Sequence, residues 1–358
     1  MADRYWVGGT ALWDGTAGTK WATTSGGAGG QSVPTSADDV FFDNLSTGTV
    51  TISTGNTGAK SINCTGFTGT LAGTSGISVA GSVTLSAGMT YTYTGGITIT
   101  GTGTLTTAGK TLSNVTVNGV GITVALGDAL TSTGLLNLTQ GTFDAAGYNV
   151  TSRVNSSNAN IRTIYMGSGL WTLPGTGTLW NIAVTTNMTF DKGTADILLS
   201  DTTTASRSIS PGDFSYNKLT IGGTTGTSAT AIGGAATFTE IASTKTVAHT
   251  IRIGANGGTY GVWSVKGTAG NVVTLNSVGT GIRRTFNLTN VTSGIDYLAV
   301  QDIECLQADR FYVGANSTNN GNNVNVIFTA APVVPTAGSN VFRSIFRPVF
   351  REIFRPIF

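Results

Sequence analysis

The sequence predicts an all-β protein, a right-handed parallel β-helix (β-solenoid) with an N-terminal cap and an extended C-terminal tail. Three observations predict this fold class: a composition rich in Thr and Gly, short runs in which apolar and polar residues alternate, and glycines placed twenty residues apart. Together they describe a long, thin core to which many short strands contribute.

The composition favours strands over helices. The chain has 358 residues, of which 51 are Gly and only 7 are Pro, and Thr is abundant. Branched side chains lose little freedom on a pleated sheet but crowd a helix. Charged residues make up 10% of the chain, against roughly 25% in typical globular domains. Because 39% of the residues are hydrophobic and evenly spread, we expect a folded protein whose surface is covered by hydroxyls and amides.

Short alternating segments follow one another from about residue 50 to 150. Each has the order apolar, polar, apolar, and Gly, Asn or Ser separates it from the next, which is the pattern of a brief half-buried strand. The predicted strands are 50–52, 77–79, 83–85, 97–99, 115–117, 122–124 and 136–138. Residues 151–330 show the same alternating segments with longer spacers between them, so we expect one continuous body.

The glycine spacing selects the architecture. Gly81, Gly101, Gly121 and Gly141 lie at intervals of twenty residues. About twenty residues suffice for one solenoid coil of three short strands and three turns, and a recurrent Gly supplies backbone freedom at a corner. A β-sandwich array is the alternative, but sandwiches use longer strands and aromatic-rich facing sheets.

Four regions are predicted: an N-terminal cap over residues 1–49, a solenoid body over 50–328, a linker over 329–340 and a tail over 341–358. The cap region holds Trp6, Trp13 and Trp21. A stacked-coil protein needs such a cap because its first coil otherwise exposes core and unpaired strand edge.

The charge distribution argues against nucleic acid as a partner. The net charge is +2, and residues 341–358 hold four Arg and one Glu, which leaves fifteen basic and sixteen acidic residues in the rest. Duplex binding normally needs a basic face that neutralises several phosphates. We therefore expect a nearly neutral body and no nucleic-acid partner.

The cysteines predict neither a disulfide nor a metal site. Cys64 and Cys305 are far apart in the sequence, and each follows an apolar residue at a spacing of two, Ile62 and Ile303. This favours two buried free thiols. One His and two Cys cannot form a familiar zinc site, so we expect no metal and no cofactor.

The N-terminal sequence predicts a location. It has no basic segment followed by an apolar stretch, and no segment reaches membrane-spanning length. We expect no signal peptide and no membrane insertion. A composition typical of surface proteins without an export signal fits a virion component that is assembled in the host cytoplasm and released by lysis.

Several stretches resemble known proteins. They are residues 4–9, 36–43, 141–150, 166–173 and 266–275, together with the pair 296–302 and 312–317. In these stretches the chain resembles a group of tailed-phage structural and fibre-like proteins. The resemblance covers about residues 4–330 and implies a β-helical virion protein, without fixing its position on the particle.

The tail departs from that resemblance and is the least random part of the sequence. Residues 342–349 and 350–357 are two versions of one octapeptide, closed by Phe358. Pro348 and Pro356 disfavour an amphipathic membrane helix, because Pro inside a helix costs about 3 kcal/mol.

In an extended chain the Phe side chains of the tail project to one side, and exposed Phe must be buried somewhere. The predicted partner-binding residues are Phe342, Arg343, Phe346, Arg347, Phe350, Arg351, Phe354, Arg355 and Phe358. Docking on another chain is our preferred interpretation; capping of the chain's own solenoid and membrane contact are the alternatives.

Some β-helices cleave polysaccharides, so an enzyme is a competing function class. Glycoside hydrolysis needs two facing carboxylates. Asp302 and Glu304, which we place on one strand face, are the candidate pair, and Asp191, Asp196 and Asp201 form a looser set. Solvated charges at strand ends are the simpler interpretation. There is no serine-nucleophile motif, and a His on a strand face, such as His249, is more often structural. We therefore predict no catalytic residues and a non-enzymatic protein.

The resulting hypothesis is a virion structural protein, whether fibre, spike or capsid decoration, that binds other virion proteins through its C-terminal tail. A receptor-binding or polysaccharide-depolymerising tail spike, with host-surface glycan as ligand, is the first alternative. A bacterial adhesin module is the second. Fibrous virion proteins usually close about an axis, so we expect a homotrimer.

Overall fold

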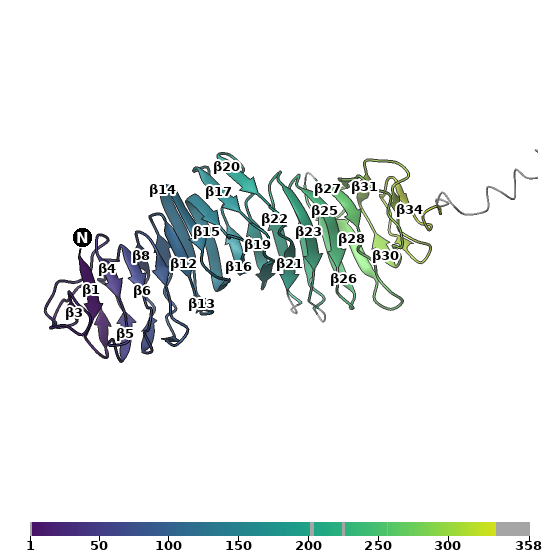
Figure 1. Cartoon of the computed structure of the whole chain (residues 1–358). Coiled ribbons are helices and arrows are strands. Elements are labelled where there is room, and N and C mark those ends of the chain that lie inside the picture. Colours follow the sequence, from purple (N-terminus) through teal and green to yellow (C-terminus); the bar gives the residue numbers. More distant parts are fainter. Residues whose placement is uncertain (1, 201–203, 224–225, 256, 334–358) are drawn as a thin grey trace, which may run out of the picture.

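The structure is a computed structural model that describes residues 2–200, 204–223, 226–255 and 257–333. These residues form a parallel β-solenoid of about 12 turns, which confirms the predicted fold class. Figure 1 shows an elongated body whose strands follow one another from the N-terminal end to β34, in sequence order along its length. The described residues contain no helix, and hence none that could span a membrane.

Thirty-four strands are described. In the N-terminal half they are β1 (Asp3–Trp6), β2 (Ala11–Trp13), β3 (Trp21–Ala22), β4 (Asp39–Phe41), β5 (Thr49–Ile52), β6 (Ser61–Asn63), β7 (Thr70–Gly73), β8 (Ile77–Val79), β9 (Val83–Thr84), β10 (Thr90–Tyr91), β11 (Ile97–Ile99), β12 (Gly103–Thr106), β13 (Thr111–Leu112), β14 (Val115–Leu126), β15 (Leu130–Asp144), β16 (Val150–Asn155) and β17 (Arg162–Tyr165). In the C-terminal half they are β18 (Trp171–Pro174), β19 (Gly177–Asn181), β20 (Met188–Asp191), β21 (Ile197–Ser200), β22 (Arg207–Ser210), β23 (Ser215–Ile221), β24 (Ala229–Ile232), β25 (Thr237–Ser243), β26 (His249–Ile253), β27 (Thr259–Trp263), β28 (Val273–Ser277), β29 (Arg284–Leu288), β30 (Leu298–Val300), β31 (Ile303–Cys305), β32 (Phe311–Tyr312), β33 (Thr318–Asn319) and β34 (Val326–Ile327).

The strands stack in parallel ladders, each strand on its counterpart one coil earlier. One ladder passes from β8 through β11, β14, β15, β16, β19, β22, β24, β26, β28 and β30 to β33. Ile77 pairs with Ile97, twenty residues later, which agrees with the glycine interval. Further along, the coils lengthen: Ile197 pairs with Leu219, and Leu219 with Ile241, at steps of twenty-two residues.

The ladders begin inside the predicted cap region. β1 pairs with β4 and β2 with β5, both in parallel, so residues 1–49 already contain a first coil. β3 covers this end of the solenoid. It pairs with β1 in an antiparallel manner, whereas the other named strand pairs of the described residues are parallel.

The strand prediction was wrong in one respect. Segments 115–117 and 122–124 were expected to be separate strands, but both belong to the twelve-residue β14, and 136–138 lies within the fifteen-residue β15. The strand continues around a corner at Gly119 and Gly121, where its register with β15 shifts.

The four spaced glycines serve two purposes. Gly121 and Gly141 have positive φ angles of 69° and 91°, as expected for corner residues. Gly101 is needed for space instead, because a Cβ there would lie 1.7 Å from the carbonyl oxygen of Ala80, while a Cβ at Gly81 would make a tight contact of 3.0 Å with the carbonyl oxygen of Lys60. The prediction that all four supply backbone freedom is therefore only half right.

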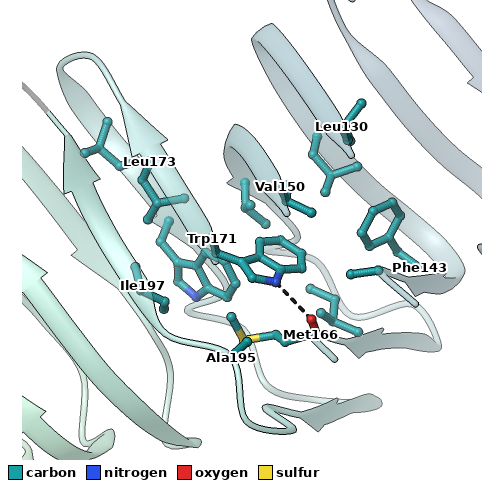
Figure 2. Packing of buried hydrophobic residues seen from close by; sticks show 14 of the residues in the cluster. Leu130, Phe143, Val150, Met166, Trp171, Leu173, Ala195 and Ile197 are labelled. Atoms are coloured by element: carbon teal, nitrogen blue, oxygen red, sulfur yellow. Dashed lines mark hydrogen bonds between the residues drawn. The ribbon is translucent and has the colours of Figure 1, made fainter. Parts of the chain in front are cut away.

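The core is one continuous column of buried side chains that extends from Trp6 to Val313. Strand residues alternate between buried and half-exposed, as in β16 and β28, which is why period-two patterning predicts them. Figure 2 shows the column near Trp171, whose indole packs among residues of successive coils and donates a hydrogen bond to the carbonyl oxygen of Met166 (3.1 Å). Cys64 and Cys305 are buried free thiols, as predicted, and burial raises the pKa of Cys64 to about 12.

Candidate functional site

The predicted partner-binding residues, Phe342 to Phe358, lie outside the described residues. The structure does describe the end of the body that precedes them. We call residues 316–328 the last coil; it contains β33 and β34.

Asparagine side chains fasten the last coil to the coil before it. The Nδ2 groups of Asn323 and Asn325 donate to the carbonyl oxygens of Val300 and Cys305, both at 2.8 Å. Asn322 and Asn325 have φ angles of 55°, and Gly321 one of 98°, so residues that tolerate the left-handed region make the tight turns. The Asn-rich sequence thus positions a coil whose strands are only two residues long.

The last coil ends the sheets with an open edge. β33 pairs with β30 and β34 with β32, and within the described ranges no strand pairs with the other edge of either. Its apolar residues Val324, Val326, Ile327 and Phe328 are half-exposed. Phe311, which pairs with Val326 from one coil earlier, is fully buried. The last layer of the core is therefore only partly covered at this end.

This edge has no charged residues. Residues 311–333 contain no Asp, Glu, Lys or Arg. Proteins usually protect exposed sheet edges with charges, Pro or a covering segment, because unpaired strands recruit other chains. An uncharged open edge therefore points to a surface that another segment covers.

The N-terminal end, by contrast, is closed by buried aromatic side chains, although the outer edge of β2 is also unpaired among the described residues. β3 covers β1, and Trp6 meets Trp21 edge to face with ring centroids 5.0 Å apart. Lys20 places a charge beside the outer strand β2. Its Nζ donates to the carbonyl oxygen of Leu12 (2.9 Å) and pairs with Asp14 (2.8 Å). The two ends of the solenoid thus differ in chemistry, and sequence reasoning missed this asymmetry although the absence of charge over 311–333 was visible.

Asp302 and Glu304 do not share one strand face, so that part of the prediction was wrong. Asp302 lies in the turn before β31 at a φ of 59°, is 2% exposed, and accepts hydrogen bonds from the backbone N–H of Gly281 (2.8 Å) and from Asn322 Nδ2 (2.7 Å). Glu304 is on the outer face of β31, where its carboxylate lies 3.7 Å from Arg283 Nε. Strand alternation would place the side chain of residue 302 on the outer face, as it does for Glu304, but the turn at Asp302 buries it. The two carboxylates therefore have separate structural roles.

Two members of the looser acidic set also accept backbone hydrogen bonds, Asp191 in a turn and Asp196 from a strand of the next coil. Asp191 accepts a hydrogen bond from the backbone N–H of Gly193 (2.9 Å), and Asp196 accepts one from that of Lys218 (3.1 Å). Asp201 lies outside the described residues.

His249 has a specific partner that the sequence did not indicate. Its Nε2 is 3.0 Å from the hydroxyl of Ser243, and its Nδ1 is 2.8 Å from the carbonyl oxygen of Val247. Burial lowers the pKa of His249 and so favours the neutral imidazole. In that form the carbonyl of Val247 requires the proton on Nδ1, so Nε2 is the acceptor for Ser243. Ser243 also borders a surface cavity of about 370 Å³ that Lys266 and Asn271 help to line. The His–Ser contact joins the end of β25 to the start of β26.

Another exposed apolar feature lies on the side of the body. Val120 is 80% and Ile161 72% exposed, and both line a depression of about 260 Å³ with Asn160 and Asn187. The depression lies at the corner within β14, and Gln140 of β15 also lines it.

Comparisons with family models, with curated proteins and with solved structures found no match for this chain.

Proposed function

We propose that this chain is a non-enzymatic virion structural protein of the tailed-phage kind, a fibre, spike or capsid decoration, attached to other virion proteins through residues 341–358. The observation that carries the proposal is the asymmetry of the solenoid: closed by aromatic residues at one end and open at the end from which the tail departs. A shaft fixed at its open end and exposed at its closed end fits that geometry.

The surface of the body supports a structural role. One outward row of β8, β11, β14, β15, β16, β19 and β22 consists of hydroxyl and amide residues, Ser78, Thr98, Thr116, Asn137, Asn155, Asn181 and Ser210. In it, Asn155 Nδ2 donates to Asn137 Oδ1 (2.9 Å), and Asn181 Nδ2 to Asn155 Oδ1 (3.0 Å). Such coil-to-coil bonds stiffen a rod while leaving it well hydrated.

The candidate acids that the structure describes have structural roles, which weakens the depolymerase alternative. Asp191 and Asp302 accept hydrogen bonds from turn residues, Asp196 accepts one from a neighbouring coil, and Glu304 forms an outward ion pair. Glycosidases need two carboxylates that flank one bond. Asp302 is buried against Gly281 and Asn322, so it has no free face for substrate.

The tail supplies the attachment chemistry. Phe side chains can each contribute about 1.5–3 kcal/mol when fully buried, before the cost of ordering the tail is subtracted. The repeated octapeptide allows two linked contacts, of which the second is effectively intramolecular. We extend the proposal to a homotrimer, because fibrous assemblies close by rotational symmetry.

The test compares the full chain with a chain that ends at Asn340, each produced in a host during particle assembly. Particles are purified on a density gradient and the chain in them is quantified. The full chain should co-purify in a fixed ratio to the capsid protein, while the shortened chain, soluble and folded by circular dichroism, should be absent. Normal incorporation of a shortened chain that merely unfolds at a lower temperature would show that the tail caps its own solenoid.

A further inference from the structure

We propose that the last coil, residues 316–328, is the docking surface for residues 341–358 of a second copy of this chain. The inference rests on the proposed function in one respect, that the tail is an attachment element, and it adds the receiving surface and the partner.

The shape of the surface favours an extended segment. β33 and β34 each have one paired and one unpaired edge within the described residues, and an extended peptide can add to such an edge through main-chain hydrogen bonds. The tail suits this mode, because Pro348 and Pro356 disfavour a helix while permitting discontinuous strand pairing.

The apolar contacts match as well. Val326 and Phe328 pack against the core but remain half-exposed, since no further coil within the described ranges covers them. Phe, Ile and Val of the tail would provide the missing layer, as one coil does for the next throughout the body.

One carboxylate beside the last coil complements the tail. Asp296 lies next to the last coil, because its carboxylate accepts hydrogen bonds from the backbone N–H (2.9 Å) and Nδ2 (2.7 Å) of Asn316. Asp302 is buried and Glu304 pairs with Arg283, so neither is free for the tail. The tail holds four Arg and one Glu, and one of these Arg can pair with Asp296.

The tail is proposed to bind another chain, and a neighbouring copy presents the surface described above. Val333 is 91% exposed, so the linker starts from the surface of the body. Exchange between copies also accounts for a homo-oligomer without a second interface.

The first experiment separates the surface from the tail. A labelled synthetic peptide of residues 341–358 is titrated into the chain that ends at Asn340, and binding is followed by fluorescence anisotropy. The peptide should bind one per chain. Thr318→Lys, at an exposed position of β33, and Val326→Lys should each weaken binding at least tenfold, whereas Val120→Lys, at the exposed side position, should leave it unchanged. Thr318→Lys changes no core side chain, so it remains informative if Val326→Lys fails to fold.

The second experiment identifies the donor. Light scattering should give a multiple of 36.5 kDa for the full chain, and a single-chain mass for the chain that ends at Asn340 and for full-length Thr318→Lys. A full chain of single-chain mass, together with peptide binding to the shortened chain, would overturn the second-copy assignment in favour of self-capping. Absence of peptide binding would overturn the docking surface itself. If full-length Thr318→Lys still enters particles normally while the chain that ends at Asn340 does not, the proposed function stands and this inference fails.

Discussion

The imidazole Nε2 of His249 accepts a hydrogen bond from the hydroxyl of Ser243 at 3.0 Å, and this contact ties the end of β25 to the start of β26. His249 is 4% exposed, and burial lowers its pKa below the ordinary value near 6.5, an effect to which the charges of Lys245 and Arg207 add. The folded protein therefore holds a neutral imidazole in an acceptor role.

This contact predicts a pH dependence of stability. As the pH falls, the unfolded chain binds the proton first, so the unfolded state is favoured progressively below about pH 6.5 until the lowered pKa of the folded state is reached. Thermal midpoints should fall between pH 7.5 and 5 for the wild type and fall less for His249→Gln. His249 is the chain's single His, so the difference reports on it alone. Parallel curves for the two proteins would contradict the assignment of a buried neutral imidazole.

Two adjacent residues test the inward and outward alternation. Trp171 is fully buried between Phe143 and Trp180, with ring centroids 6.0 and 5.5 Å away, whereas Leu170 is 39% exposed. Trp171→Ala should lower the free energy of unfolding by about 3–5 kcal/mol through loss of burial and the cavity left behind. Leu170→Ala should change it by less than about 1 kcal/mol. Equal effects in denaturant titrations would contradict the placement of this strand.

The close stacking of coils predicts a sharp difference between two glycines. A Cβ at Gly101 would lie 1.7 Å from the Ala80 carbonyl oxygen, while the nearest atom to a Cβ at Gly76 is 3.5 Å away. Gly101→Ala must push two coils apart, and we expect a loss of about 1–3 kcal/mol. Gly76→Ala should stay within about 1 kcal/mol of the wild type. Thermal unfolding of both variants measures this, and a tolerated Gly101→Ala would contradict the coil spacing there.

The acidic residues near the open end should affect stability and not chemistry. Asp302→Asn keeps a residue that tolerates the left-handed backbone but places an amide against hydrogen-bond donors, so it should cost about 1–3 kcal/mol. Glu304→Gln removes an outward ion pair and should cost at most about 1 kcal/mol. The double variant should leave any clearing of host polysaccharide unchanged. Loss of clearing by a normally folded double variant would support the depolymerase alternative.

Much of the fold follows from local sequence. Alternation predicts most strands because one face of each is buried, and Ile77 and Ile97 show the predicted twenty-residue step. The merging of segments into β14 could not be predicted, because it depends on how the corner at Gly121 pairs with the next coil. The later twenty-two-residue steps likewise reflect turn lengths set by neighbouring coils.

The candidate site was less predictable, since it arises from contacts between distant residues. Asp302 and Glu304 alternate in the sequence, yet a positive φ at Asp302 sends their side chains to different places. Ser243 and His249 are in contact only because the loop between β25 and β26 brings their side chains together. The tail repeat was evident from the sequence, whereas the open last coil required the strand pairing.

Electron microscopy of purified particles, with gold bound to a tag placed before residue 1, most directly tests whether this chain is a virion shaft attached by its C-terminal end. About 12 coils spaced by roughly 4.8 Å give a shaft of roughly 55–60 Å, so the gold should lie at about that distance or more from the particle surface. Gold in direct contact with the surface, or particles that carry no gold while the folded chain remains in the soluble fraction, would contradict it.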